Sequence, residues 1–495
     1  MKRTGFVLPG TTILLAAMLA LVSCGEPGGT GGLDGPDDTD DTSGETMDNP
    51  FNILNYEPKS HYTIEIAGDE IALKTTGAKT AAYQYRTGLP GGMVIVRPGE
   101  SLSFHVANRD VDSTSLHWHG LRVPFDQDGP GKILPKGAEA DFAFTLDMTG
   151  THWYHPHQRP ILPQLNAGLY APFIVKENYD SKYAGDYVLV LDDWNLGPNN
   201  QLDNDSGSSH GSTDIIGSLE TVNKRRGKDI YPIALKRGEI VKLRFINAST
   251  AQGHTLSMQD HQFRITHLDG HYLQEPYTVN YFRIAPGERV DVELKGIRDS
   301  GVYRIRNERN FGISIPVIYV GTGEDMESPF VPGPSEAFPG IESQELRHEY
   351  RLNSGMGGHD HGDMTMLMEW TINGVAFINA DSPIDIQNLA VGEVYKIRFK
   401  NEEGSGMMHS TVYHPMHLHG GHFQVVSLNG APPPRETFKD TVEIPPLQYV
   451  DIGVKFRYPG DWMLHCHIID HEDNGMLTMI HVSESGEPGP PPMHH

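Results

Sequence analysis

Gly460-Asp461-Trp462-Met463-Leu464-His465-Cys466-His467 is the segment that decides the fold, because two earlier segments of the chain follow the same pattern. These are residues 150–157, which read GTHWYHPH, and residues 301–308, which read GVYRIRNE. Counted from the first glycine of each segment, His155 and His157 match His465 and His467. The middle copy has Arg306 and Glu308 at these two positions. The chain is therefore predicted to contain three copies of one unit, the middle one without these histidines.

A second repeated segment lies upstream in each unit and predicts the type of fold. Residues 101–108, 241–247 and 395–401 each follow a Gly-Glu turn, alternate apolar and polar side chains, and end at asparagine. Short alternating segments separated by Gly and Pro are typical of strands, so each unit is predicted to be an all-β sandwich. The predicted domains are residues 51–178, 184–325 and 345–483.

The length and the charge of the chain narrow its class. A chain of 495 residues is too long for one hydrophobic core, which agrees with three domains. The Pro/Gly/Glu-rich run from Glu324 to Glu342 is predicted to link the second domain to the third, and residues 484–495 to form a disordered tail. The net charge of −25 argues against binding to nucleic acid or to anionic membranes, because both select basic patches.

The N-terminus has the pattern of an export signal. Met1-Lys2-Arg3 is followed by an apolar stretch to Val22 and then by Ser23-Cys24. Residues 1–24 resemble a bacterial lipoprotein signal in which Cys24 receives the lipid; an ordinary signal peptide with a chance cysteine is the alternative. Residues 25–50 are poor in apolar side chains and are predicted to be a disordered linker. We therefore expect an exported cell-envelope protein, periplasmic or on the outer surface, that touches the membrane only through this lipid anchor.

Paired histidines are the strongest sign of metal binding. Residues i and i+2 of a strand point to the same face, roughly 6.5–7 Å apart, so one pair can serve two metal ions side by side. A single pair is more often part of a core. Four pairs at matching positions of the first and third units indicate metal binding, because each buried ring nitrogen otherwise needs a hydrogen-bond partner. The pairs are His117/His119, His155/His157, His417/His419 and His465/His467.

The third unit adds a second set of metal ligands. The chain has two cysteines, and since Cys24 belongs to the signal, no disulfide is predicted and Cys466 needs a chemical role. His414, His471 and Met476 lie in the same unit. A thiolate with two imidazoles and a weak thioether is the ligand set of a blue-copper electron-transfer site. The histidines that flank the cysteine then point to the opposite face, so one short peptide joins two metal sites.

These motifs resemble those of the multicopper oxidases, the laccase-like family. The match spans about residues 60 to 483, and the resemblance implies three consecutive cupredoxin-like domains with Greek-key sandwiches. One departure is that Gly420-Gly421 precedes His422 where many relatives have a single glycine, which leaves the local loop undetermined. The four motifs are HWHG at 117–120, HPH at 155–157, HPMHLH at 414–419 and HCHIIDHEDNGM at 465–476.

The resemblance also implies four copper ions, one of type 1, one of type 2 and two of type 3, with every ligand position of the family filled. The implied ligands are His414, Cys466 and His471 with axial Met476 for type 1; His117 and His417 for type 2; His119, His155 and His467 for one type 3 ion; and His157, His419 and His465 for the other. Asp128 and Glu472 match acidic residues that resemble proton donors in this family. The alternative for these two is a solvated surface carboxylate.

The implied reaction couples four one-electron oxidations at the type 1 copper to the reduction of O2 to water at the three-copper cluster. The predicted reductants are a broad range of phenols, as for a laccase, and the alternative is Cu(I), as for a cuprous oxidase that detoxifies copper. The Met/His-rich stretch 356–368 and Met407-Met408-His409 carry thioethers suited to Cu(I), although an ordinary loop explains them equally well. The alternative from a different functional class is a non-catalytic protein that stores copper or acts as a scaffold in the cell envelope. The complete set of copper ligands argues against this alternative. A monomer is expected.

Overall fold

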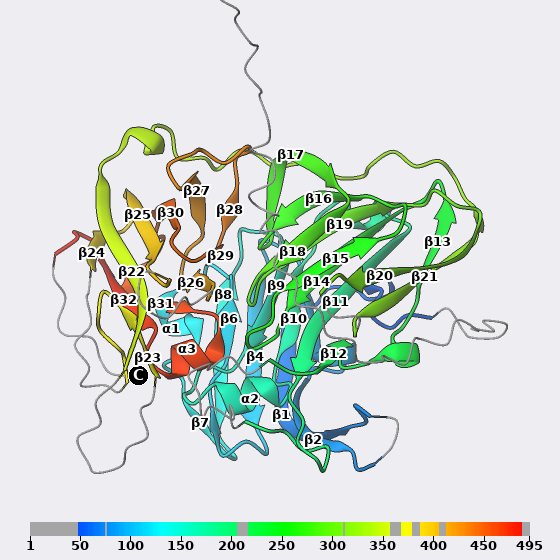
Figure 1. Ribbon diagram of the computed structural model, residues 1–495, viewed down its shortest axis with the longest axis horizontal. Coiled ribbons are helices and arrows are strands. Elements are labelled where there is room, and N and C mark those ends of the chain that lie inside the picture. The colour runs from blue at the N-terminus through cyan, green and yellow to red at the C-terminus, as the bar shows by residue number, and fades with distance from the viewer. Residues whose placement is uncertain are drawn as a thin grey trace, which may run out of the picture. The chain divides into compact units, whose positions relative to one another are not determined.

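The computed structural model describes residues 48–74, 77–204, 216–309, 312–356, 368–378, 387–404 and 412–487. The predicted signal and most of the linker that follows it lie outside these residues, as does most of the predicted tail. Among the described residues, no helix is long and apolar enough to cross a membrane. The described part is mostly β and forms the three cupredoxin domains that the repeats predict (Figure 1). The residue boundaries given above for the domains stay predictions.

The first domain packs two four-stranded sheets, ordered β2-β1-β4-β8 and β3-β10-β9-β6. In β4 the side chains of Leu102, Phe104 and Val106 enter the core, while Ser101 and Ser103 are exposed, as the alternating pattern predicts. The strands are β1 His61–Ile71, β2 Thr80–Arg86, β3 Val94–Val96, β4 Ser101–Asn108, β5 Ser113–Thr114, β6 His117–His119, β7 Leu134–Pro135, β8 Glu139–Thr145, β9 Gly150–His155 and β10 Ala171–Val175. The helices are η1 Ile53–Asn55, η2 Pro90–Gly92, α1 Phe125–Asp128, α2 Leu162–Asn166 and η3 Asp180–Lys182.

The middle domain packs a six-stranded sheet, β12-β11-β14-β19-β16-β17, on a five-stranded sheet, β13-β21-β20-β15-β18. Its apolar core lies between these two sheets. The elements are β11 Gly185–Trp194, β12 Leu219–Val222, η4 Gly227–Asp229, β13 Ile233–Arg237, β14 Ile240–Asn247, β15 His254–Met258, β16 Phe263–Leu268, β17 His271–Val279, β18 Tyr281–Ile284, β19 Arg289–Lys295, β20 Ser300–Asn307 and β21 Ser314–Thr322.

The third domain repeats this arrangement with the sheets β23-β22-β25-β30-β27-β28 and β24-β32-β31-β26-β29. In all three domains the first strand pairs in parallel with the strand of the Gly-Glu repeat: β1 with β4, β11 with β14, and β22 with β25. The elements are η5 Ile341–Ser343, β22 Leu346–Met356, β23 Met368–Ile372, β24 Gln387–Ala390, β25 Val394–Asn401, β26 His414–Leu418, β27 Phe423–Leu428, β28 Phe438–Lys439, β29 Thr441–Ile444, β30 Tyr449–Lys455, β31 Gly460–Cys466, α3 Ile469–Asp473 and β32 Leu477–Ser483.

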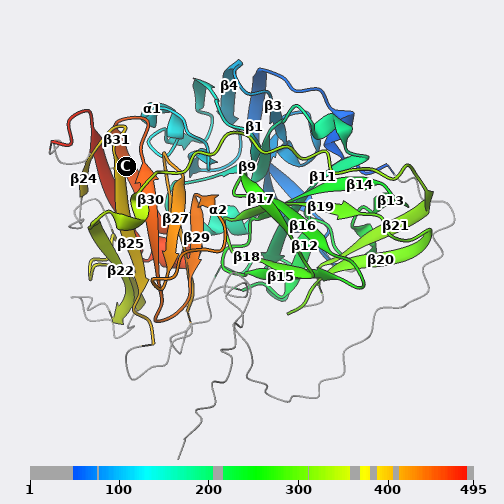
Figure 2. The ribbon, with the colours of Figure 1, turned by 90° about the horizontal axis from the view of Figure 1, so that it is seen from above.

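Strand pairing brings the histidine pairs of each outer domain together. His117 of β6 is opposite His155 of β9, and His417 of β26 is opposite His465 of β31. The equivalent position in the middle domain pairs Ser257 of β15 with Arg306 of β20. This register confirms the predicted alignment of the three repeats. Both views of the ribbon place β31 of the third domain beside α1 of the first domain, and Figure 1 also shows α3 beside α2 (Figure 1, Figure 2).

Candidate copper centre

Three of the four predicted type 1 ligands form a compact triangle. Cys466 Sγ lies 3.7 Å from His414 Nδ1 and 3.6 Å from His471 Nδ1, and the two nitrogens are 3.3 Å apart. The centre of such a triangle lies about 2 Å from each corner, close to ordinary metal–imidazole and metal–thiolate bond lengths. All three side chains are fully buried. The geometry therefore fits one metal ion in a trigonal thiolate–imidazole site.

Met476 and α3 complete the surroundings of this triangle. The Met476 carbonyl accepts a hydrogen bond of 3.0 Å from the Cys466 N–H, and the Met476 N–H donates one of 2.8 Å to the His471 carbonyl. The Met476 side chain is buried in the same apolar cluster as Cys466. Trp370 of β23, which the sequence did not single out, stacks on the His471 ring at 3.7 Å between centroids. Apolar burial and this indole therefore shield the site from water.

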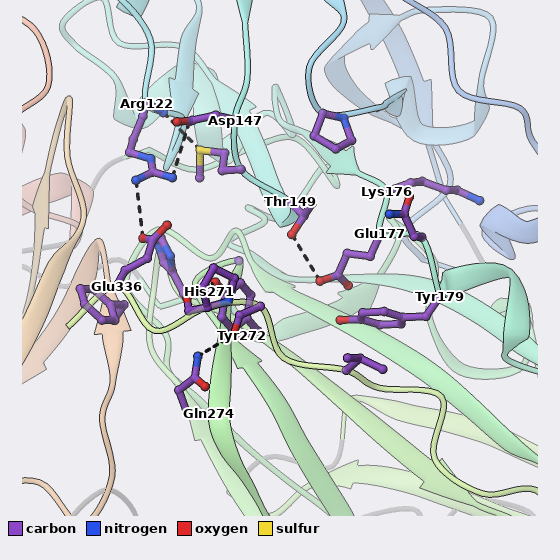
Figure 3. A pocket seen from close by; sticks show the side chains of 18 of the residues that line it. Arg122, Asp147, Thr149, Lys176, Glu177, Tyr179, His271, Tyr272, Gln274 and Glu336 are labelled. Atoms are coloured by element: carbon purple, nitrogen blue, oxygen red, sulfur yellow. Dashed lines mark hydrogen bonds and ion pairs between the residues drawn. The ribbon is translucent and has the colours of Figure 1, made fainter.

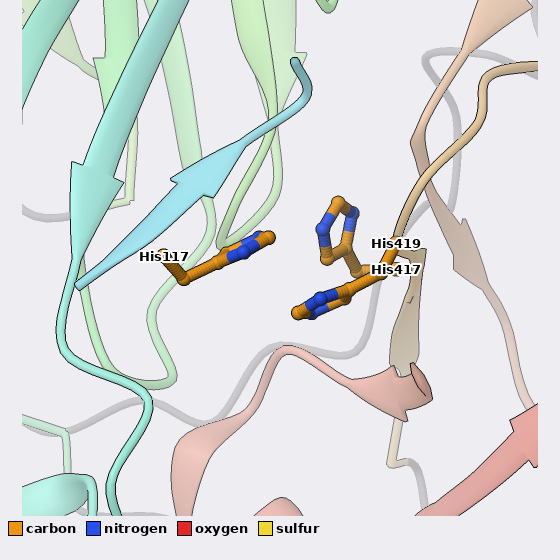
Figure 4. Close-up of side chains that lie close together, drawn as sticks. All are labelled: His117, His417 and His419. Carbon is orange, nitrogen blue, oxygen red and sulfur yellow. The ribbon is translucent and has the colours of Figure 1, made fainter. Parts of the chain in front are cut away.

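The eight paired histidines converge between the first and third domains, and all eight are buried. His119 Nδ1 lies 3.3 Å from His155 Nε2, and His419 Nε2 lies 3.0 Å from His465 Nε2. Figure 4 shows the rings of His117, His417 and His419 turned toward one another from their two strands. Ligand atoms lie within 4.8 Å of one another in several triplets, among them His117/His417/His419, His117/His119/His155 and His157/His419/His465.

Hydrogen bonds to backbone carbonyls fix the tautomer of three of the cluster imidazoles. His155, His417 and His465 each donate an Nδ1–H to a backbone carbonyl, at 2.9, 3.0 and 3.0 Å. A carbonyl oxygen can only accept, so the proton is on Nδ1 and the Nε2 lone pair faces the cluster. This arrangement, in which one ring nitrogen is held by a hydrogen bond and the other faces the cluster, is typical of metal-ligating histidine.

Within the described residues, several ring nitrogens at the cluster make no hydrogen bond. Both nitrogens of His117 and of His467, and Nε2 of His417, are buried without a hydrogen bond. Buried polar atoms are nearly always paired, so this many unpaired nitrogens in one place indicates a missing partner that accepts lone pairs. A set of metal ions meets that requirement.

Burial and mutual repulsion keep most of these imidazoles neutral. Burial, followed by the neighbouring imidazoles, lowers the pKa of His155, His157, His419 and His467 well below the usual value. Burial would also lower the pKa of His465, but Glu472 beside it raises that pKa above the usual value. Neutral imidazole is the form that binds a metal, so the site is prepared for cations.

Asp128 and Glu472 are buried against the histidines, which excludes the surface-carboxylate alternative. Asp128 Oδ2 lies 2.8 Å from His419 Nδ1, and its Oδ1 lies 3.5 Å from His117 Nδ1. Glu472 Oε2 lies 2.9 Å from His465 Nδ1. Each carboxylate therefore contacts the outer nitrogen of a cluster histidine, a position from which it can orient the ring or exchange a proton with it.

A third acidic residue, Asp440, has the same kind of position and was not predicted. Its Oδ1 lies 3.2 Å from His119 Nε2, and its Oδ2 lies 2.5 Å from Arg289 NH2 of the middle domain. The middle domain thus contributes no histidine to the cluster but supplies the cation behind it. Asp440 directly precedes β29. It belongs to none of the histidine and cysteine motifs, so those motifs did not point to it.

The unusual Gly-Gly sequence leaves the ligand strand unchanged. Gly420 has φ +71, and the Trp462 ring occupies the space that a side chain at this position would need. The strand β26 before it keeps its pairing with β31. Gly420, Gly421 and His422 lie in the turn between β26 and β27. Residues 357–367 and 405–411, which hold most of the Met/His-rich sequence, lie outside the described residues.

Fold and site together define a copper oxidase with one thiolate–imidazole site and a cluster of eight histidines, consistent with type 1, type 2 and type 3 coppers. Sequence models described as multicopper oxidase match residues 69–180, 185–317 and 355–486, which is most of the chain. The chain belongs to the multicopper oxidase family and is a copper-dependent oxidoreductase that reduces O2.

Individual relatives agree with this assignment. The chain is 26% identical to a multicopper oxidase of Mycobacterium tuberculosis, over 82% of this chain and 84% of that one. Among solved structures, a laccase from Pediococcus acidilactici is 26% identical, with a TM-score of 0.70 and coverage of 86% and 89%. A Campylobacter jejuni multicopper oxidase described as a metallo-oxidase is 25% identical, with a TM-score of 0.69 and coverage of 85% and 91%.

Proposed function

We propose that the chain couples four one-electron oxidations at the Cys466 site to the reduction of O2 to water at the histidine cluster. When bound, a type 1 copper accepts single electrons and a three-copper cluster delivers four of them to O2. The observation that carries the proposal is that adjacent residues at the end of β31 belong to two ligand sets. Cys466 belongs to one set and His465 to the other, and the His467 ring lies 5.0 Å from that of His119 between centroids.

The short distances support the ligand assignment that the family resemblance implies. His157, His419 and His465 form one triplet, and the contact between His119 and His155 supports a second. The assignment is His414, Cys466, His471 and Met476 for type 1; His117 and His417 for type 2; and His119, His155 and His467 with His157, His419 and His465 for the type 3 pair.

Asp128 and Glu472 are proposed to move protons to the reacting oxygen. Forming water consumes four protons per O2, and a buried cluster receives them only through positioned acids. Both carboxylates are buried and lie within 3 Å of a cluster histidine, His419 and His465 respectively. Each can hold a proton beside the cluster without being a copper ligand.

Cu(I) is the reductant that the surroundings of the type 1 site favour. His414 Nε2, the ring edge that a phenol would contact, is buried and has no hydrogen-bond partner among the described residues, and Trp370 covers His471. The Met/His-rich sequence joins β22 to β23, and Trp370 lies two residues beyond its last methionine, Met368. Soft thioethers suit Cu(I), and one of the similar structures is a metallo-oxidase. We further propose export to the cell envelope on a lipid at Cys24.

Phenol oxidation is the second candidate, because another similar structure is a laccase. Leucine in place of Met356, Met364, Met366, Met368, Met407 and Met408 distinguishes the two, since Leu–Met exchanges usually cost less than about 1.5 kcal/mol. A selective loss of Cu(I) oxidation, with phenol oxidation unchanged, supports the cuprous assignment. Met258→Leu, a buried exchange in the middle domain, is the control. Unchanged Cu(I) oxidation in the variant with all six substitutions would mean that the Met/His-rich stretch is an ordinary loop.

A further inference from the structure

Two histidines outside the proposed copper ligands face each other between the middle and third domains. His271 is the first residue of β17, and His422 lies just before β27. Their ring centroids are 4.3 Å apart at an interplanar angle of 47°. His422 directly follows Gly420-Gly421 in the turn between β26 and β27.

Each ring has one buried nitrogen that makes no hydrogen bond to any residue described by the structure. These atoms are His271 Nε2 and His422 Nδ1. The His422 residue is only 7% exposed, so water does not reach its nitrogen freely. Buried polar atoms are rarely left unpaired, and two such atoms on adjacent rings indicate a shared ligand.

Glu336, in the linker between the middle and third domains, prepares His422 to bind a cation. Its Oε2 lies 3.0 Å from His422 Nε2, and Arg122 lies 3.6 Å from the same carboxylate. Because the Arg122 cation and this imidazole keep the carboxylate ionised, the His422 proton resides on Nε2 and Nδ1 retains its lone pair. A carboxylate behind the distal nitrogen is the usual support of a metal-ligating histidine.

A cavity of about 540 Å³ borders one side of the pair. His271, Arg122, Tyr272 and Glu336 form part of its wall, whereas His422 does not line it (Figure 3). The cavity is partly open, so an ion can approach the pair from the side of His271. Burial lowers the pKa of both imidazoles below the usual value, so both rings are neutral near pH 7.

We propose that His271 Nε2 and His422 Nδ1 bind a divalent transition-metal ion at a fifth metal site, with Glu336 positioning His422 and water filling the open positions. Imidazole pairs suit Co²⁺, Ni²⁺, Cu²⁺ and Zn²⁺, and Cu²⁺ generally binds such ligands most tightly. A bound ion would join the middle domain to the third, because the two ligands come from different sheets of different domains. It would therefore stabilise the folded chain in proportion to its occupancy.

The test uses the full chain loaded with its four coppers and titrated with Co²⁺, whose visible absorption reports coordination. The wild type should bind one Co²⁺ per chain and show a higher Tm in its presence. His271→Gln and His422→Gln should lose this absorption and the Tm shift, and Glu336→Gln should weaken binding by about 10- to 100-fold. The control is His105→Gln, an exposed imidazole 2.9 Å from Asp141.

Folding of each variant is checked by its unchanged type 1 absorption before Co²⁺ is added. The site is refuted if the wild type takes up no Co²⁺ beyond the four coppers. It is equally refuted if His271→Gln binds Co²⁺ as the wild type does, or if His105→Gln removes binding to the same extent as His271→Gln. None of these outcomes bears on O2 reduction, so they leave the proposed oxidase activity unaffected.

Discussion

The Nε2 atoms of His157 and His465 lie 3.3 Å apart, although 308 residues separate them in the chain. The first belongs to the first domain and the second to the third. Two imidazole lone pairs at this distance repel each other unless a proton or a metal ion lies between them. The same His465 nitrogen also lies 3.0 Å from His419 Nε2, so three rings share one focus that a cation stabilises.

Removal of His465 or His467 should separate the two halves of the reaction. Neither residue belongs to the Cys466 triangle, so the thiolate–copper colour should persist in His467→Ala. Reductant should bleach this colour, but O2 uptake should fall to background because the cluster has lost a ligand. The measurement combines visible absorption with an oxygen electrode. Oxygen uptake at the wild-type rate in His467→Ala would contradict the proposed connection.

Asp128→Asn and Glu472→Gln should slow O2 reduction while type 1 reduction stays nearly unchanged. Positioned acids typically contribute about 10²–10⁴-fold, so turnover should fall within that range and its pH dependence should change. The check is stopped-flow reoxidation of the reduced enzyme across pH. The matched control is Asp126→Asn, an exposed carboxylate two residues from Asp128 in α1. If both variants reoxidise at the wild-type rate at every pH, neither carboxylate moves protons.

Arg289→Met should destabilise the chain strongly, although Arg289 is not a copper ligand. It would leave the buried Asp440 carboxylate without its cation, and breaking a buried pair costs about 3–5 kcal/mol. Urea unfolding measures this loss. Arg237→Met removes an exposed pair with Asp299 and should cost less than about 1 kcal/mol. Equal losses for the two variants would mean that the middle domain does not support the cluster.

Much of the fold could be predicted because the three repeats are visible in the chain. Arg306 of β20 occupies the position that His465 occupies in the third domain, as the repeats predicted, and the structure pairs it with Ser257 of β15 where the third domain has His417. The histidines were also found from sequence, since His-x-His spacing on a strand is a local pattern. These predictions needed only short-range periodicity.

The supporting residues could not be found in this way. Asp440 and Arg289 are 151 residues apart and meet only because the middle and third domains pack together. Trp370 covers the type 1 site from β23, and its contact with His471 depends on how the two sheets of the third domain pack. Such contacts correspond to no regular spacing of residues in the sequence, so only the folded chain identifies them.

Acid should destabilise the copper-free chain. Burial lowers the pKa of His417 to about 4, whereas an unfolded histidine titrates near 6.5. Between these values the unfolded state binds more protons than the folded state, so the free energy of unfolding falls as pH decreases from about 6.5 to 4. His417 alone contributes roughly 3 kcal/mol to this loss. Denaturant unfolding at several pH values measures it.

The copper-loaded chain is the control for this pH effect. Bound metal ions compete with protons for the same lone pairs, so its stability should begin to fall only at lower pH than that of the copper-free chain. Constant stability of the copper-free chain between pH 7 and 5 would contradict the buried, neutral imidazoles.

The most direct test is the stoichiometry of the reaction, measured as reductant oxidised against O2 consumed, with peroxide assayed in the same samples. The account predicts four electrons per O2, no free peroxide, and loss of both turnover and the thiolate–copper absorption in Cys466→Ser. Two electrons per O2 with accumulation of peroxide, or full turnover in Cys466→Ser, would contradict it.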